Sequence, residues 1–428
     1  MICSTKKQPM AFFKKAFYFV LALPFVIQTL VAQQKVTINP PAHIQSIVLK
    51  PLKVNTYAPI IRLGDSFILE FDDLESDQKR YSYKIEHYDF NWENSNLNAT
   101  EFLNGFNSDL IRDYENSFNT LQDYTHYKVQ LPNDNIQLKI SGNYLISVLD
   151  ESDVVIFTRP FIVYQPSVTV GVTTHRSRDI ASLNTKQNIQ FTINHPNVLI
   201  NNPSLEIKTA IYQNNDWNTV IKNTKPQFIQ GSQLLYKYNA KLFFEAGNEY
   251  LYFDTKEIRN ATNNIARTEL KDIFNTYLYT DEERLHRGYS YNPDVNGNFV
   301  LRTIDTDDIN TEGDYSWVHF SLESFEDIGT KPIYIYGDFN GWQLTEANQM
   351  RYDSSTKLYH GKLLLKQGFY NYTYVIQNED GTINKSAIEG SFYQTENQYT
   401  VLVYYRPYGT RFDQVIGVGN ANSENLRN

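Results

Sequence analysis

A short strand runs directly into a tight turn and then a tryptophan in the segment Ile333-Tyr334-Ile335-Tyr336-Gly337-Asp338-Phe339-Asn340-Gly341-Trp342. Its Ile and Tyr residues alternate, which is the period of a β-strand, and Asp-Phe-Asn-Gly has the composition of a tight turn. Further strand-sized runs follow between residues 357 and 405, with a Gly or Asn break before the next run. The segment therefore predicts the edge of one small Ig-like β-sandwich.

This pattern resembles the early-set glycogen-binding modules of branching enzymes. The resemblance implies that a sugar is held by two exposed Trp rings and a Lys. Trp342 stands in the place of the first ring, but residues 377–383 contain no Trp and Thr373 stands where the Lys is expected. Two interpretations of Trp342 stay open, a lone ring that stacks on a sugar and a ring that packs over the sandwich edge; we favour the second.

The N-terminus has the three parts of a secretory signal peptide. Lys6, Lys7, Lys14 and Lys15 precede an apolar core over residues 16–27, and Ala32 precedes a polar start. We expect residues 1–32 to be cleaved. Cys3 is the single cysteine and lies ahead of the apolar core, so it is not placed as a lipid anchor, and the mature chain has no thiol for a disulfide, a nucleophile or a thiolate metal site.

The chain is acidic. Its net charge is −9, and removal of residues 1–32 takes away four Lys and no Asp or Glu, which gives −13 for the mature chain. Nucleic acids and anionic lipid surfaces both require clustered Lys and Arg. The charge therefore argues against both as partners.

The composition predicts an all-β chain. Tyr occurs 32 times and Phe 26 times, and aromatic residues suit a pleated sheet surface. Alternating Tyr strands are also typical of a transmembrane barrel, but the strand-sized runs here are mostly shorter than barrel strands and carry charges on both faces. We therefore predict tandem β-sandwiches of Ig-like or early-set type after the signal peptide.

Breaks in the strand pattern predict the domain boundaries. We expect a signal peptide over 1–32, an N-terminal sandwich over 33–165, a second sandwich over 166–310, a C-terminal Ig-like early-set domain over 311–410 and a tail over 411–428. An aromatic stretch without alternation, residues 89–114, interrupts the first sandwich. It is either functional or folded against a sandwich.

Catalytic and metal motifs are missing from the sequence. No two of the eight His have metal-ligand spacing, and there is no His-Glu-x-x-His, Gly-x-Ser-x-Gly or glycine-rich phosphate loop. Asp294 and Asp305 resemble part of a calcium loop, but Phe299 stands where Gly is required, and Asn296-Gly297 as a type I′ turn explains the segment more simply. Adjacent carboxylates, such as Asp72-Asp73, point to opposite faces of a strand and are poor acid/base pairs. We expect no enzyme activity, no cofactor and no metal.

Six segments together resemble the plug proteins of the type IX secretion system. They are Tyr81–Trp92, Glu101–Phe106, Tyr124–Tyr127, Phe157–Phe161, Lys256–Arg259 and Gly337–Trp342. The resemblance implies a non-catalytic protein of the periplasm, at the inner face of the outer membrane. It implies a role as a plug for the periplasmic opening of the outer-membrane translocon barrel, which is then the expected partner.

Three aromatic residues of these segments are the candidate partner-binding residues, because aromatic side chains are enriched in the cores of protein interfaces. They are Trp92, Phe106 and Trp342. The alternative function is that of a secreted carbohydrate-binding protein that uses the C-terminal early-set module. An exposed stacking platform around Trp342 would distinguish it from the plug.

Overall fold

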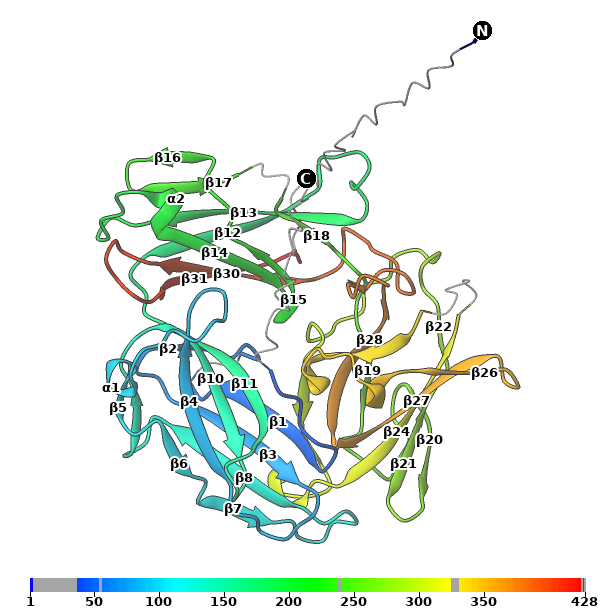
Figure 1. Ribbon diagram of the computed structural model, residues 1–428. Helices are drawn as coiled ribbons and strands as arrows, with labels where there is room; N and C mark the ends of the chain where they lie inside the picture. Colours follow the sequence, from blue (N-terminus) through cyan, green and yellow to red (C-terminus); the bar gives the residue numbers. More distant parts are fainter. Residues whose placement is uncertain (3–36, 54–55, 238–240, 325–330, 425, 427–428) are drawn as a thin grey trace. The chain divides into compact units, whose positions relative to one another are not determined.

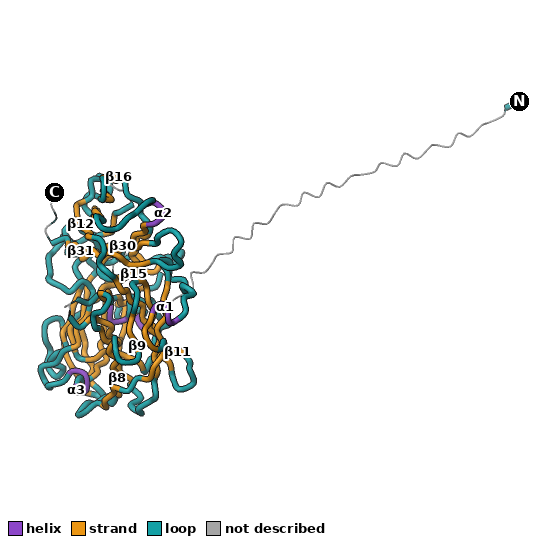
Figure 2. The backbone as a smooth tube through the Cα atoms, turned by 90° about the vertical axis from the view of Figure 1, so that its left-hand side faces the viewer, coloured by secondary structure: helices purple, strands orange, loops and turns teal. Residues whose placement is uncertain are grey.

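A computed structural model describes residues 1–2, 37–53, 56–237, 241–324, 331–424 and 426. The elements below all lie in the compact unit Val36–Asn428. The predicted signal peptide beyond residue 2, with its cleavage site, lies outside the described residues. Strands make up 47% and helices 5% of the chain, which confirms the all-β prediction (Figure 1). In the described part of the chain no helix is long and apolar enough to cross a membrane, and the helices are short turns between strands (Figure 2).

The first sandwich contains the N-terminal strands, blue to cyan in Figure 1. One sheet has the order β1-β3-β8-β7, the other β2-β11-β10-β4-β6, and β5 pairs with β9. Alternate residues of β4 are buried, as a strand with one face in the core requires. The elements are β1 Ile44–Pro51, β2 Ile60–Arg62, β3 Phe67–Asp73, β4 Ser82–Tyr88, α1 Ala99–Phe102, β5 Leu103–Gly105, β6 Ser108–Leu110, β7 Asp113–Asn116, β8 Thr125–Leu131, β9 Ile136–Leu138, β10 Gly142–Leu149 and β11 Val155–Tyr164.

The second sandwich combines residues from the middle and the end of the chain. One sheet has the order β12-β13-β17-β16, with β18 also paired to β13, and the other has the order β15-β14-β30-β31. Side chains of both sheets share one hydrophobic core. The elements are β12 Thr169–Arg176, β13 Lys186–Asn194, α2 Pro203–Glu206, β14 Ile207–Gln213, β15 Asp216–Lys222, β16 Phe228–Gln230, β17 Gln233–Tyr236, β18 Phe243–Glu245, β30 Gln398–Tyr405 and β31 Gln414–Asn422.

The third sandwich is built around β28, which pairs with β19, β23, β25 and β29. Its second sheet has the order β20-β21-β24-β27-β26, with β22 also paired to β24. The elements are β19 Leu251–Asp254, β20 Ile265–Leu270, β21 Phe274–Leu278, β22 Asp281–Glu282, β23 Phe299–Leu301, α3 Ile309–Glu312, β24 Tyr315–Glu323, β25 Ile333–Tyr336, η1 Asp338–Asn340, η2 Glu346–Asn348, β26 Arg351–Asp353, β27 Leu358–Lys366, β28 Gly368–Gln377 and β29 Ile383–Asn384.

Two predicted boundaries do not coincide with these pairings. Strands β19 to β23 lie before residue 310 but belong to the third sandwich, and β30 lies before residue 410 but pairs with β14 over residues 399–405. The predicted tail contains β31. Strand β30 is buried on both faces, so its apolar run is compatible with a central place in either sheet. The prediction placed it in the C-terminal domain because it is close in sequence to the other strands of that domain.

The turn after β25 has the conformation that its sequence predicts. Asp338–Asn340 form one 3₁₀ turn, and Gly341 adopts φ 62°, a left-handed conformation that glycine tolerates best. Trp342 follows and is 5% exposed, in a cluster with Tyr250, Tyr334 and Tyr336. The tryptophan therefore packs over the sandwich, and its ring is not available as a sugar platform.

Candidate functional site

A buried aspartate lies at each contact between two of the three sandwiches. Asp413 lies where the first sandwich meets the second, Asp72 where the first meets the third, and Asp216 where the second meets the third. Each is at most 1% exposed. A carboxylate buried in this way must be paired or fully hydrogen-bonded. We call these three clusters the Asp413, Asp72 and Asp216 junctions.

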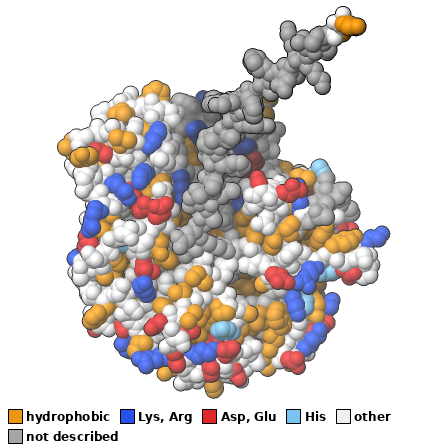
Figure 3. Space-filling model, in the orientation of Figure 1, with side chains coloured by type: hydrophobic (Ala, Val, Ile, Leu, Met, Phe, Trp, Pro, Cys, Tyr) orange, Lys and Arg blue, Asp and Glu red, His pale blue; other side chains and the backbone are white. Residues whose placement is uncertain are grey.

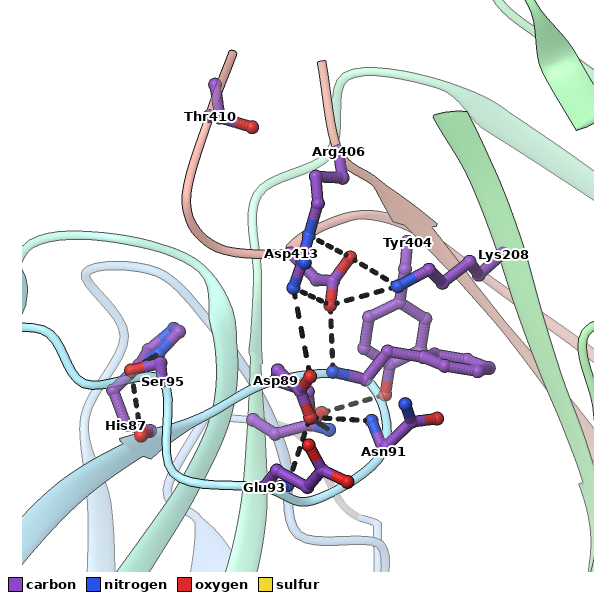
Figure 4. Close-up of polar contacts among 12 residues, drawn as sticks. His87, Asp89, Asn91, Glu93, Ser95, Lys208, Tyr404, Arg406, Thr410 and Asp413 are labelled. Atoms are coloured by element: carbon purple, nitrogen blue, oxygen red, sulfur yellow. Dashed lines mark hydrogen bonds and ion pairs between the residues drawn. The ribbon is translucent and has the colours of Figure 1, made fainter. Parts of the chain in front are cut away.

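The Asp413 junction receives the loop that follows β4. Within this loop Asp89 Oδ1 accepts hydrogen bonds from the backbone N–H groups of Asn91 (2.8 Å) and Glu93 (3.0 Å), which is an Asx-turn arrangement. The folded loop presents the N–H of Phe90 to Asp413 Oδ2 at 3.0 Å. Figure 4 shows Asp89 and Asp413 facing each other across this contact.

Two cations complete the Asp413 junction. Arg406 donates to both carboxylate oxygens, at 2.9 and 2.6 Å, in a bidentate pair, and Lys208 Nζ lies 3.1 Å from Oδ1 (Figure 4). Arg406 also lies 3.8 Å from Asp89. One arginine therefore links a carboxylate of each sandwich.

An apolar cluster surrounds this junction. The Phe90 ring packs edge-on against Tyr404 with 4.9 Å between centroids, and Trp92 packs edge-on against Trp217 at 5.7 Å. Residues 89–95 of the aromatic stretch 89–114 are thus folded against the second sandwich, one of the two alternatives that its sequence left open, and the later part of the stretch contributes β5, β6 and the start of β7 to the first sandwich. Burial also lowers the pKa of the adjacent His87 to about 4, so this imidazole is neutral at neutral pH.

The Asp72 junction is a buried ion pair. Asp72 Oδ2 accepts from Lys366 Nζ and from the Tyr315 hydroxyl, both at 2.7 Å, and His126 Nδ1 lies 2.7 Å from Oδ1. Lys366 is 1% exposed and its ammonium lies 4.1 Å from the centroid of the Tyr124 ring. Burial alone would raise the pKa of Asp72, but Lys366 and His126 outweigh it and hold the pKa below its usual value.

The Asp216 junction joins β15 to the third sandwich. Asp216 Oδ2 accepts from the Tyr336 hydroxyl at 2.7 Å and from Lys385 Nζ at 2.5 Å. Asn218 donates to the carbonyl oxygen of Trp342 at 2.9 Å. The Ile333–Trp342 segment therefore holds two sandwiches together.

The three predicted partner-binding residues do not form one site. Trp92 is half-buried at the Asp413 junction and Trp342 is buried at the Asp216 junction. Phe106 follows β5 and is 70% exposed. Of the three, Phe106 offers the most surface to a partner.

The junction residues were not found from the sequence. Asp413 and its hydrogen-bond donor Phe90 are 323 positions apart in the sequence, and Asp72 and Lys366 are 294 positions apart. No spacing rule connects such residues. One feature of the sequence could have pointed to a junction, namely the pair Asp72-Asp73 inside an apolar strand, where solvated carboxylates are unusual.

Among the described residues, one group of three side chains has metal-ligand proximity, namely His43, Asp73 and Glu75. Lys79 forms ion pairs with both carboxylates, and Tyr81 donates to Asp73 at 2.9 Å. A divalent cation would have to displace the ammonium. We therefore interpret this group as an ion-pair network.

The segment that resembles a calcium loop is a turn. Asn296 and Gly297 adopt φ 55° and 80°, as a type I′ turn requires. The carboxylate of Asp294 accepts the backbone N–H groups of Asn296 and Tyr250, each at 2.6 Å. Burial raises the pKa of Asp294 to about 7.

Comparison with known proteins supports the assignment of the first sandwich. Residues 44–165 match the family model for the first domain of the type 9 secretion system plug protein. This span covers the strands of the first sandwich. No curated protein sequence matches the chain.

A solved structure has the same fold. It is the crystal structure of a hypothetical protein from Parabacteroides merdae, which is 34% identical, covers 90% of this chain and 98% of its own, and superposes with a TM-score of 0.87. The Escherichia coli alpha-2-macroglobulin in its native conformation is 7% identical over 92% of this chain and 28% of its own. Its TM-score is 0.19, too low to indicate a shared fold. From the family match, residues 44–165 belong to the family of type 9 secretion system plug protein first domains.

Proposed function

We propose that the chain is a non-catalytic component of the type IX secretion system that binds the outer-membrane translocon barrel and occludes its periplasmic opening. The observation that carries the proposal is the match of the whole first sandwich to the plug domain. The site of action is the periplasm, at the inner face of the outer membrane.

The three junctions give a physical reason why this fold suits a stopper. A body that blocks a wide opening must resist separation of its domains. At two of the junctions the paired charges come from different sandwiches, Asp72 with Lys366 and Asp216 with Lys385. Removal of one partner of a buried charge pair costs about 3–5 kcal/mol, so separation of the third sandwich from the other two is unfavourable. Such a body needs no reactive group.

Co-purification tests the proposed partner. The tagged chain is recovered from detergent-solubilised outer membrane, and the translocon is expected as the main stoichiometric companion. The matched control is a strain that lacks the translocon. Recovery of the chain as a monomer from both strains would contradict the proposal.

Retention on a polysaccharide column tests the alternative, carbohydrate-binding function. Because the Trp342 ring is buried, we expect no specific retention. Micromolar retention that is lost on Trp342→Ala would favour the alternative.

A further inference from the structure

The outer face of the third sandwich carries stacked aromatic and cationic side chains. Along β24 the core residues Val318 and Phe320 alternate with Trp317 and His319, so the latter two lie on the face away from the core. In register with His319 are Tyr277 on β21 and Lys362 on β27, and Tyr277 pairs with Arg267 on β20. One row of side chains thus crosses four strands.

These side chains hold one another in place. The Arg267 guanidinium lies 3.9 Å from the centroid of the Tyr277 ring, and that ring stacks on His319 with 4.2 Å between centroids and an interplanar angle of 9°. Lys362 Nζ lies 4.6 Å from the centroid of Trp317. Cations fixed over aromatic faces lose less conformational freedom when they bind a partner.

The face is positive on an acidic chain. We define the cationic face as Arg267, Lys271, Tyr277, Trp317, His319 and Lys362. Glu269 pairs with Arg267 and Lys271, so the three cations exceed the one carboxylate, whereas the whole chain has a net charge of −9. Figure 3 shows Lys and Arg side chains gathered at the lower right, over the strands labelled β24 and β27 in Figure 1.

The pKa of His319 reflects the same charges. Burial, followed by Lys362, Lys271 and Arg267, lowers the pKa of His319. Its Nε2 lies 2.9 Å from Asn275 Oδ1. At neutral pH the ring is therefore neutral and serves as a stacking surface, and the positive charge comes from the Lys and Arg.

We infer that the cationic face is the surface with which this protein docks on the translocon, and that the translocon presents carboxylates to it. This inference rests on the proposed function. Arg, Tyr and Trp are the residues that dominate binding energy at protein interfaces. Ring faces covered by cations do not suit the stacking of sugars or bases, whereas the outward N–H groups suit carboxylates.

A protein partner fits this face better than a lipid surface does. Binding to anionic lipid takes clusters of about four to eight Lys or Arg, and an extended bilayer would also meet the acidic remainder of the chain. A protein interface is local, and charges beyond about 8 Å are screened at physiological salt. A protein partner therefore needs negative charge only where it contacts the cationic face.

Charge reversal tests the inference. Arg267→Glu/Lys362→Glu should weaken co-purification with the translocon at least tenfold, and binding by the wild-type chain should weaken as salt rises. The matched control is Lys53→Glu/Arg112→Glu, which reverses two exposed cations on the first sandwich (66% and 62%, against 59% for Arg267). Unchanged thermal unfolding of both variants shows that they fold.

The possible outcomes separate this inference from the proposed function. If the wild-type chain does not co-purify with the translocon, both fail. If wild type and the Arg267→Glu/Lys362→Glu variant co-purify equally well, the inference is wrong and the proposed function stands. Binding of wild type, but not of the variant, to phosphatidylglycerol vesicles, with translocon binding intact, would assign the face to lipid and also overturn the inference.

Discussion

At the scale of single residues, the chain depends on charges that are buried far from their sequence neighbours. Asp72 illustrates what the sequence could and could not reveal. Neighbours in a strand point to opposite faces, and Asp72 and Asp73 do so, with Asp73 accepting from Tyr81 and Asp72 from Tyr315. What could not be predicted is that the third sandwich covers Asp72, because burial by a distant segment leaves no local pattern.

Substitution of Asp72 tests the buried pair. Asp72→Asn leaves the Lys366 ammonium without its counter-charge, and we expect the free energy of unfolding to fall by about 3–5 kcal/mol. Urea denaturation measures the change. Asp65→Asn is the control, because it removes a carboxylate paired with the 66% exposed Lys53 and should cost less than about 1 kcal/mol. Equal effects of the two substitutions would show that the Asp72 junction contributes little.

The raised pKa of Asp281 predicts that the free energy of unfolding depends on pH. Its Oδ2 accepts from the hydroxyl groups of Tyr372 and Tyr374, and burial raises its pKa to about 6. A raised carboxylate pKa means that the folded state keeps its proton while the unfolded state releases it. The contribution to stability is therefore present below the unfolded pKa of about 3.9 and is lost as pH rises to about 6.

The variant Asp281→Asn should remove this dependence. Its amide oxygen can accept from both tyrosines without ionising, so relative to wild type it gains about 2–3 kcal/mol of stability between pH 4 and pH 7. Urea denaturation across this range measures the gain. The control is Asp134→Asn, at an exposed position, which should show the same pH profile as wild type. Parallel profiles for wild type and Asp281→Asn would contradict the assigned pKa.

At the scale of elements, the positions of the strands were more predictable than their partners. The Ile/Tyr alternation of Ile333–Tyr336 placed β25 correctly, because successive side chains of a strand point to opposite faces. The pairing of β30 with β14 was missed, because a run that is buried on both faces carries no mark of its neighbour. The sandwich class therefore follows from local pattern, and the domain boundaries do not.

Truncation of Phe90 tests whether the loop after β4 joins the first sandwich to the second. Phe90→Ala removes a ring that is 4% exposed and packs against Tyr404 and the Lys208 ammonium. We expect a loss of about 3–5 kcal/mol in the free energy of unfolding and faster proteolysis between the first and second sandwiches. Phe106→Ala, which truncates the same residue type at a 70% exposed position, should change stability by less than about 0.5 kcal/mol. A similar loss in both variants would mean that the loop does not join the sandwiches.

At the scale of the whole molecule, three sandwiches are joined pairwise by Asp72, Asp216 and Asp413, each paired with a Lys or Arg. The plug domain match covers the first sandwich, and the cationic face lies on the third. Docking through one sandwich can thus position another, provided that the junctions stay closed. The proposed occlusion and the inferred docking can therefore be tested separately.

Outer-membrane permeability is the most direct test of occlusion. In a strain without this protein but with the translocon, large antibiotics should cross the outer membrane, because the channel lacks its stopper. Additional removal of the translocon should restore the barrier. Unchanged antibiotic sensitivity in the single deletion, with the translocon present at its normal level, would contradict the proposed function.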